Sequence, residues 1–201
     1  MPPELSNTSF IGRLLEEISR ETAVRYRSGG RRLENVLTAE VLMPLSYLPR
    51  DVFLGEVLRS ANGADAARAL AAAEIEAAEV GLLPGELTPL LGVTVQPDAE
   101  LSGPSSYVLI EAKRQGRSSF QPTQLAKEFV AAKAAAADRR PLVLLILGAP
   151  PPAAVRGYGS LMPEDAVADY LPAVTGTPAA ETDRDAVTRE ALDTIAWTTW
   201  G

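Results

Sequence analysis

Apolar residues recur with two different periods along this chain, and the change of period separates a helical part from a part with strands. At 5–27 and 31–47 they recur every three or four residues, which predicts two amphipathic helices. Two shorter helices are predicted at about 50–60 and 64–75. We therefore expect residues 1–75 to form a helical N-terminal part.

Farther along the chain the pattern becomes typical of strands. Residues 76–101 mix Val and Leu with turn residues, which indicates two extended segments, the second of them at 93–101. The runs at 107–114 and 141–148 predict two more strands. Between them, a proline in the first turn and the residues after it predict a helix over 122–137.

The last part of the chain, 151–201, begins with a Pro- and Ala-rich loop. Helices are predicted at 163–170 and 184–194, and the alternating segment 195–200 could add a strand to the sheet. A chain of 201 residues is long enough to bury a substantial core in one domain. The expected fold is therefore a single α/β domain with a mixed sheet of about four to five strands flanked by helices, and its core lies at 76–150.

The composition excludes several kinds of chemistry. There is no cysteine, which excludes disulfides and thiolate zinc sites and favours a cytoplasmic location. There is no histidine either, so histidine-based catalysis and histidine metal ligands are excluded. The longest apolar run, 141–148, is too short to span a membrane, and no signal-peptide pattern is evident at the N-terminus. A hard cation held by carboxylates remains compatible with this composition.

The net charge is −7, which argues against tight, nonspecific binding of nucleic acid by the whole surface. A local basic groove is still compatible with this charge. Arg114, Arg117 and Lys127 follow the most informative motif of the chain and could contact phosphates. Solvated faces of ordinary helices explain each of these cations equally well.

That motif consists of two charged groups at the ends of consecutive predicted strands. Pro97-Asp98 comes near the end of the first strand, and Glu111-Ala112-Lys113 comes near the end of the second. Because residues two apart in a strand face the same side, Glu111 and Lys113 share one face, and pairing of the two strands can place Asp98 beside Glu111. Two adjacent carboxylates repel unless a cation lies between them, and oxygen ligands suit Mg²⁺ or Mn²⁺.

This arrangement of Pro-Asp and Glu-x-Lys resembles the signature of the PD-(D/E)XK nuclease superfamily. The predicted order of helix, three strands, helix and strand over about 30–150 is similar to the restriction-endonuclease-like core. The resemblance implies a metal-dependent nuclease that hydrolyses phosphodiester bonds, with DNA as the expected partner. It also implies that Asp98, Glu111 and the carbonyl of Ala112 hold the metal, and that Lys113 orients the nucleophilic water or stabilises the transition state.

The same family often adds an acid from a helix before the strands. Glu34, in the segment Gly30-Arg-Arg-Leu-Glu34, is the preferred candidate. Glu40 and Glu17 compete with it, because this position is defined only by a helix and a loose spacing. A solvated helix acid is an equally good interpretation of Glu34.

Some members of the family also place a glutamine on the helix after the Glu-x-Lys strand. Gln121 and Gln124 are available here, and Gln124 lies inside the predicted helix. The Gln-x-x-x-Tyr variant of one branch is not matched, because Glu128 stands where the tyrosine would be. The chain is therefore not assigned to that branch.

Two other interpretations of the sequence remain open. The motif could be a surface hairpin with salt-bridged ends. The fold could also serve as a non-catalytic module that binds nucleic acid or protein, which the acidic net charge favours. In addition, the N-terminal helices could form a homodimer interface or bind a partner protein.

Overall fold

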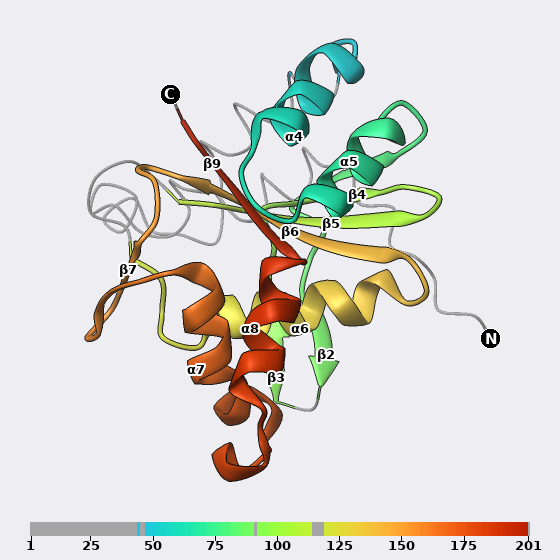
Figure 1. The fold of residues 1–201 in the computed structure, drawn as a ribbon. Coiled ribbons are helices and arrows are strands. Elements are labelled where there is room, and N and C mark those ends of the chain that lie inside the picture. The colour runs from blue at the N-terminus through green and yellow to red at the C-terminus, as the bar shows by residue number, and fades with distance from the viewer. Residues whose placement is uncertain (1–43, 45–46, 91, 114–118, 201) are drawn as a thin grey trace, which may run out of the picture.

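The centre of the fold is a mixed sheet of five strands in the order β1-β4-β5-β6-β9 (Figure 1). The computed structural model describes residue 44 and residues 47–90, 92–113 and 119–200. The strands of the sheet are Glu79–Leu82 (β1), Ala99–Ser102 (β4), Ser106–Ala112 (β5), Arg140–Leu147 (β6) and Ile195–Thr199 (β9). β4 runs antiparallel to β1 and β5, whereas β6 runs parallel to both β5 and β9.

Helices cover both faces of this sheet. Their bounds are Asp51–Gly55 (η1, a π-helical turn), Glu56–Ser60 (α4), Asp65–Ala73 (α5), Gln124–Ala136 (α6), Pro163–Thr175 (α7), Ala179–Glu181 (η2, a 3₁₀ turn) and Arg184–Leu192 (α8). α4 and α5 lie on one face, and α6, α7 and α8 lie on the other (Figure 1). Because parallel neighbours need a crossover connection, α6 links β5 to β6, and α7 and α8 lie in the link from β6 to β9.

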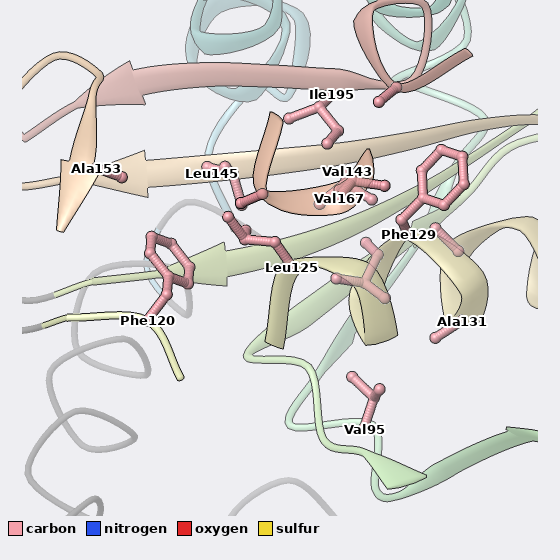
Figure 2. Packing of buried hydrophobic residues seen from close by; sticks show 14 of the residues in the cluster. Val95, Phe120, Leu125, Phe129, Ala131, Val143, Leu145, Ala153, Val167 and Ile195 are labelled. Carbon is pink, nitrogen blue, oxygen red and sulfur yellow. The ribbon is translucent and has the colours of Figure 1, made fainter. Parts of the chain in front are cut away.

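Side chains alternate between the two faces along the central strand β5. Val108 and Ile110 pack in the apolar cluster beneath α4 and α5, whereas Tyr107 and Leu109 pack in the cluster against α6, α7 and α8. Figure 2 shows part of the second cluster, with Phe129 among its members. Every residue of β5 is buried, so a charged group at the end of this strand lies in a region of low dielectric constant.

The predicted α/β class is confirmed, including a mixed sheet of five strands flanked by helices. Helices are present where the pattern predicts them at 50–60, 64–75, 163–170 and 184–194. The alternating segment near the C-terminus is also a strand of the sheet, β9, as its pattern suggests. The helices predicted at 5–27 and 31–47 lie outside the described residues, apart from residues 44 and 47.

The prediction of one strand over 93–101 is wrong. The segment Val93–Val95 (β3) pairs with Leu87–Leu90 (β2) in a separate hairpin, and β4 begins only at Ala99. Pro97 lies between them and has no backbone N–H to donate, so it interrupts the strand. Residues 76–101 therefore contain four short strands rather than two extended segments.

The expected loop after residue 150 contains a further hairpin. Ala153–Val155 (β7) pairs with Gly159–Leu161 (β8) in antiparallel fashion. Phe120 attaches to this hairpin, since its N–H donates to the carbonyl of Ala154 at 2.9 Å and its carbonyl accepts from the N–H of Arg156 at 2.9 Å. In the part of the chain that the structure describes, no helix is both long and apolar enough to cross a membrane.

Candidate active site

Asp98 lies directly before β4, at the end of the sheet where β5 finishes. The antiparallel ladder pairs Ala99 with Ile110, so Asp98 comes beside the last residues of β5. Its N–H donates to the carbonyl of Ile110 at 3.1 Å, and its Oδ2 accepts from the N–H of Ala112 at 2.7 Å. The residue is 7% exposed. These bonds fix a buried carboxylate at the end of the central strand.

Glu111 and Lys113 form a close ion pair at the same end of β5. The Nζ of Lys113 donates to Oε1 of Glu111 at 2.6 Å, and the two side chains are 13% and 7% exposed respectively. The ammonium group also lies 5.2 Å from the ring centroid of Phe120. The predicted convergence of Asp98, Glu111 and Lys113 at one place is therefore present in the structure.

Gln124 is the first residue of α6, and it connects that helix to the carboxylate of β5. Its Nε2 donates to Oε1 of Glu111 at 2.6 Å. Its own Oε1 accepts from the N–H of Gln121 at 3.3 Å, which fixes the orientation of the amide. Gln124 therefore reaches the site, as the sequence predicts, whereas Gln121 supports it through the backbone.

Glu128 is the residue of this site that the sequence interpretation missed. It lies one helical turn after Gln124 on α6 and is 1% exposed. Within the part of the chain that the structure describes, its Oε2 has no hydrogen-bond partner. Burial raises the pKa of Glu128 well above its ordinary value, and the negative charge of Glu111 raises it further. Lys113 and Gln124 oppose this shift without cancelling it.

A signal for Glu128 was present in the sequence. Leu125, Glu128, Phe129 and Ala132 follow the i, i+3, i+4, i+7 spacing of a buried helix face. Three of these positions are apolar and fill the core, so the glutamate occupies a core position. An acid on an apolar helical stripe is unusual, because burial of an unpaired carboxyl group is costly.

The backbone of Lys113 is held by two other strands. Its N–H donates to the carbonyl of Ile146 in β6 at 2.7 Å. Its carbonyl accepts from the indole Nε1 of Trp200, which follows β9, at 2.7 Å. Trp200 was not among the predicted site residues, because this contact joins segments 87 residues apart in the chain.

Some of the predicted residues lie in the described part of the chain, and others do not. Glu34, Arg114 and Arg117 lie outside the described residues. Lys127 is half-buried on α6, directly before Glu128, so a turn of about 100° around the helix separates the two side chains. Ala112 is buried, and the role of its carbonyl as a metal ligand stays a prediction.

The donors fit a hard cation, although they do not form a preassembled cluster of three. Asp98, Glu111 and Glu128 offer only oxygen atoms, and one oxygen of Glu128 lacks a partner. In the described ranges, no group of three or more acidic side chains lies close enough to hold a metal ion as it stands. Two carboxylates with backbone and water oxygens would suit Mg²⁺, which keeps several waters in protein sites.

The chain was also compared with known proteins at the levels of sequence and fold. No family model, curated protein or solved structure matches it. Its function must therefore be inferred from the residues themselves.

Proposed function

We propose that this protein is a Mg²⁺- or Mn²⁺-dependent nuclease that hydrolyses phosphodiester bonds of DNA. The observation that carries the proposal is the meeting of Asp98, Glu111 and Lys113 at the end of β5, with Gln124 bonded to Glu111. These residue types in this order resemble the PD-(D/E)XK signature. The antiparallel pair β4-β5 and the parallel pair β5-β6 joined by α6 are compatible with that resemblance.

Each residue has a role that follows from its chemistry. Asp98 and Glu111, with the carbonyl of Ala112, would hold the divalent ion. Such an ion acidifies water and neutralises charge on a phosphate. Lys113 brings an ammonium group within 2.6 Å of Glu111, where it can orient water or stabilise a negatively charged oxygen of the substrate. Gln124 fixes the carboxylate of Glu111 by donating to the same oxygen as Lys113.

The test uses supercoiled plasmid and end-labelled single strands, incubated with the purified protein in Mg²⁺, Mn²⁺ or EDTA. We expect metal-dependent cleavage that is abolished by Asp98→Asn. Asp138→Asn is the matched control, because it removes the same charge from an exposed position beyond the C-terminus of α6. This control should cut like the original protein.

The same experiment can contradict the proposal. Cleavage that survives in EDTA, or that Asp98→Asn leaves unchanged, would remove the assignment of this site. Absence of cleavage together with salt-dependent binding of DNA would instead identify a binding module on the same fold.

A further inference from the structure

The carboxyl group of Glu128 is the feature of this site that the proposed function leaves without a role. It faces the site because Gln124 and Glu128 are four residues apart on α6, and side chains at this spacing are neighbours on one helix face. The bond from Gln124 to Glu111 turns that face toward the end of β5. The charge of Glu111 also acts on Glu128.

The hydrogen bonding of Glu128 is incomplete in a way that sets it apart from other buried polar groups. Its Oε2 is buried and lacks a hydrogen-bond partner, whereas the other buried side-chain oxygen and nitrogen atoms of the described residues each have one. A buried polar atom without a partner destabilises the fold because its solvation is lost without replacement. A leucine of similar volume would avoid this cost, so the fold alone does not explain an acid at this position.

Two other buried acids lie near Glu128, and the negative charge of each acts on it. Asp98, Glu111 and Glu128 are three carboxyl groups that are each less than a tenth exposed. Lys113 is ion-paired with Glu111 and provides one positive charge to this group. Ionised carboxylates that share a region of low dielectric constant repel one another, and a divalent cation between them would offset this repulsion.

We propose that Glu128 binds the divalent ion together with Asp98 and Glu111, as the third carboxylate of the site. This inference rests on the proposed function, because it assumes that an ion binds at the end of β5. It predicts a small movement of the Glu128 side chain when the ion binds, since the three acids are not spaced as a ready cluster. In this role α6 supplies both an acid and the amide that holds Glu111 in place.

The test measures binding of Mn²⁺ alone, by calorimetry and by the electron paramagnetic resonance signal of free Mn²⁺, without nucleic acid. Glu128→Gln keeps the shape of the side chain and removes its charge. We expect it to weaken Mn²⁺ binding by about 10- to 100-fold. Glu190→Gln, an exposed acid on α8, is the matched control and should bind like the original protein. In EDTA, Glu128→Gln should unfold at the same temperature as the original protein or higher.

The outcomes separate this inference from the proposed function. Unchanged Mn²⁺ affinity in Glu128→Gln, with binding lost in Asp98→Asn, would overturn the role of Glu128 and leave the metal site intact. No Mn²⁺ binding by the original protein would overturn both. Glu128→Leu is the second variant, because it fills the same space. Loss of folding in both Glu128 variants would show that the acid serves the fold and would also overturn the inference.

Discussion

Glu74, which follows α5, lies near the start of β5, and Glu128 of α6 lies near its end. The carboxyl groups of these two glutamates are hydrogen-bonded in very different ways. Near the start of β5, Glu74 accepts from the N–H of Ser105 at 3.0 Å and from the hydroxyl of Ser106 at 2.7 Å. At the other end of β5, Oε2 of Glu128 has no hydrogen-bond partner among the residues that the structure describes. Burial acts to raise the pKa of Glu74, but these hydrogen bonds together lower it below its ordinary value. The pKa of Glu128 is raised.

The contrast indicates which acid serves the fold and which is available for chemistry. The chain closes tightly around Glu74: a Cβ added to Gly103 would lie 2.6 Å from Oε2 of Glu74 and 2.6 Å from the hydroxyl of Ser106. A side chain at this position would therefore displace the carboxylate of Glu74 or the hydroxyl of Ser106. Glu74 has its donors from the chain itself, whereas Glu128 has an oxygen that an added ion could satisfy, and this difference supports the proposed role of Glu128.

The largest expected effect comes from breaking the ion pair at the functional end. Lys113→Met leaves the buried carboxylate of Glu111 without its ammonium partner, and breaking such a pair costs about 3 kcal/mol or more. Cleavage should fall by about 100-fold or more, because a group that stabilises developing charge is lost. Urea unfolding in EDTA and plasmid cleavage in Mn²⁺ measure the two effects.

The control is Lys133→Met, which breaks an ion pair of the same residue types on the surface. Lys133 and Glu190 are 41% and 48% exposed, so we expect a loss of less than about 1 kcal/mol and unchanged cleavage. Equal losses of stability in the two variants would show that the site is as well solvated as the surface.

Replacement of Glu74 should have a smaller effect on the free energy of unfolding, and this effect should depend on pH. Glu74→Gln weakens the hydrogen bonds from Ser105 and Ser106 and should cost about 1.5 kcal/mol at pH 7. Because the folded-state pKa of Glu74 is lowered, its contribution is fully present above the unfolded pKa of about 4.3. The contribution is lost as the pH falls through the folded pKa.

Urea titrations of both proteins between pH 7 and pH 3 would test this sign. The stability difference between the original protein and Glu74→Gln should shrink as the solution becomes more acidic. A difference that stays constant or grows would show that ionisation of Glu74 does not stabilise the fold.

The shared face of Glu111 and Lys113 could be predicted from sequence because strand periodicity is a local property. The alternation of Val108, Ile110 and Ala112 with Glu111 determines which face the acid shares with Lys113, whatever the rest of the fold does. The boundaries were less predictable. A segment such as 93–101, in which apolar and polar residues alternate around a proline, can be one strand or two, and the pairing partners decide between them.

The apolar stripe of α6 marks Glu128 as an unusual acid, but local periodicity could not place Glu128 or Trp200 beside the site. Glu128 is buried because α6 packs against the sheet beside β5, and helical periodicity shows the apolar stripe without showing what lies opposite it. Trp200 meets Lys113 only because β9 adds to β6 in parallel register, which brings the end of the chain beside the end of β5. Both contacts depend on long-range packing that no local pattern encodes.

The smallest predicted effect concerns Trp200, which holds the backbone of Lys113 at the end of β5. Trp200→Phe keeps a ring but removes the N–H that donates to the carbonyl of Lys113, at a cost of about 1 kcal/mol in the free energy of unfolding. Because the lysine backbone is held less firmly, kcat should fall a few-fold while KM stays unchanged. Trp197→Phe is the control, since Trp197 packs with the cluster on the opposite face of the sheet and should leave kcat unaltered. The same fall in kcat for both variants would show that Trp200 acts through general stability and not by positioning Lys113.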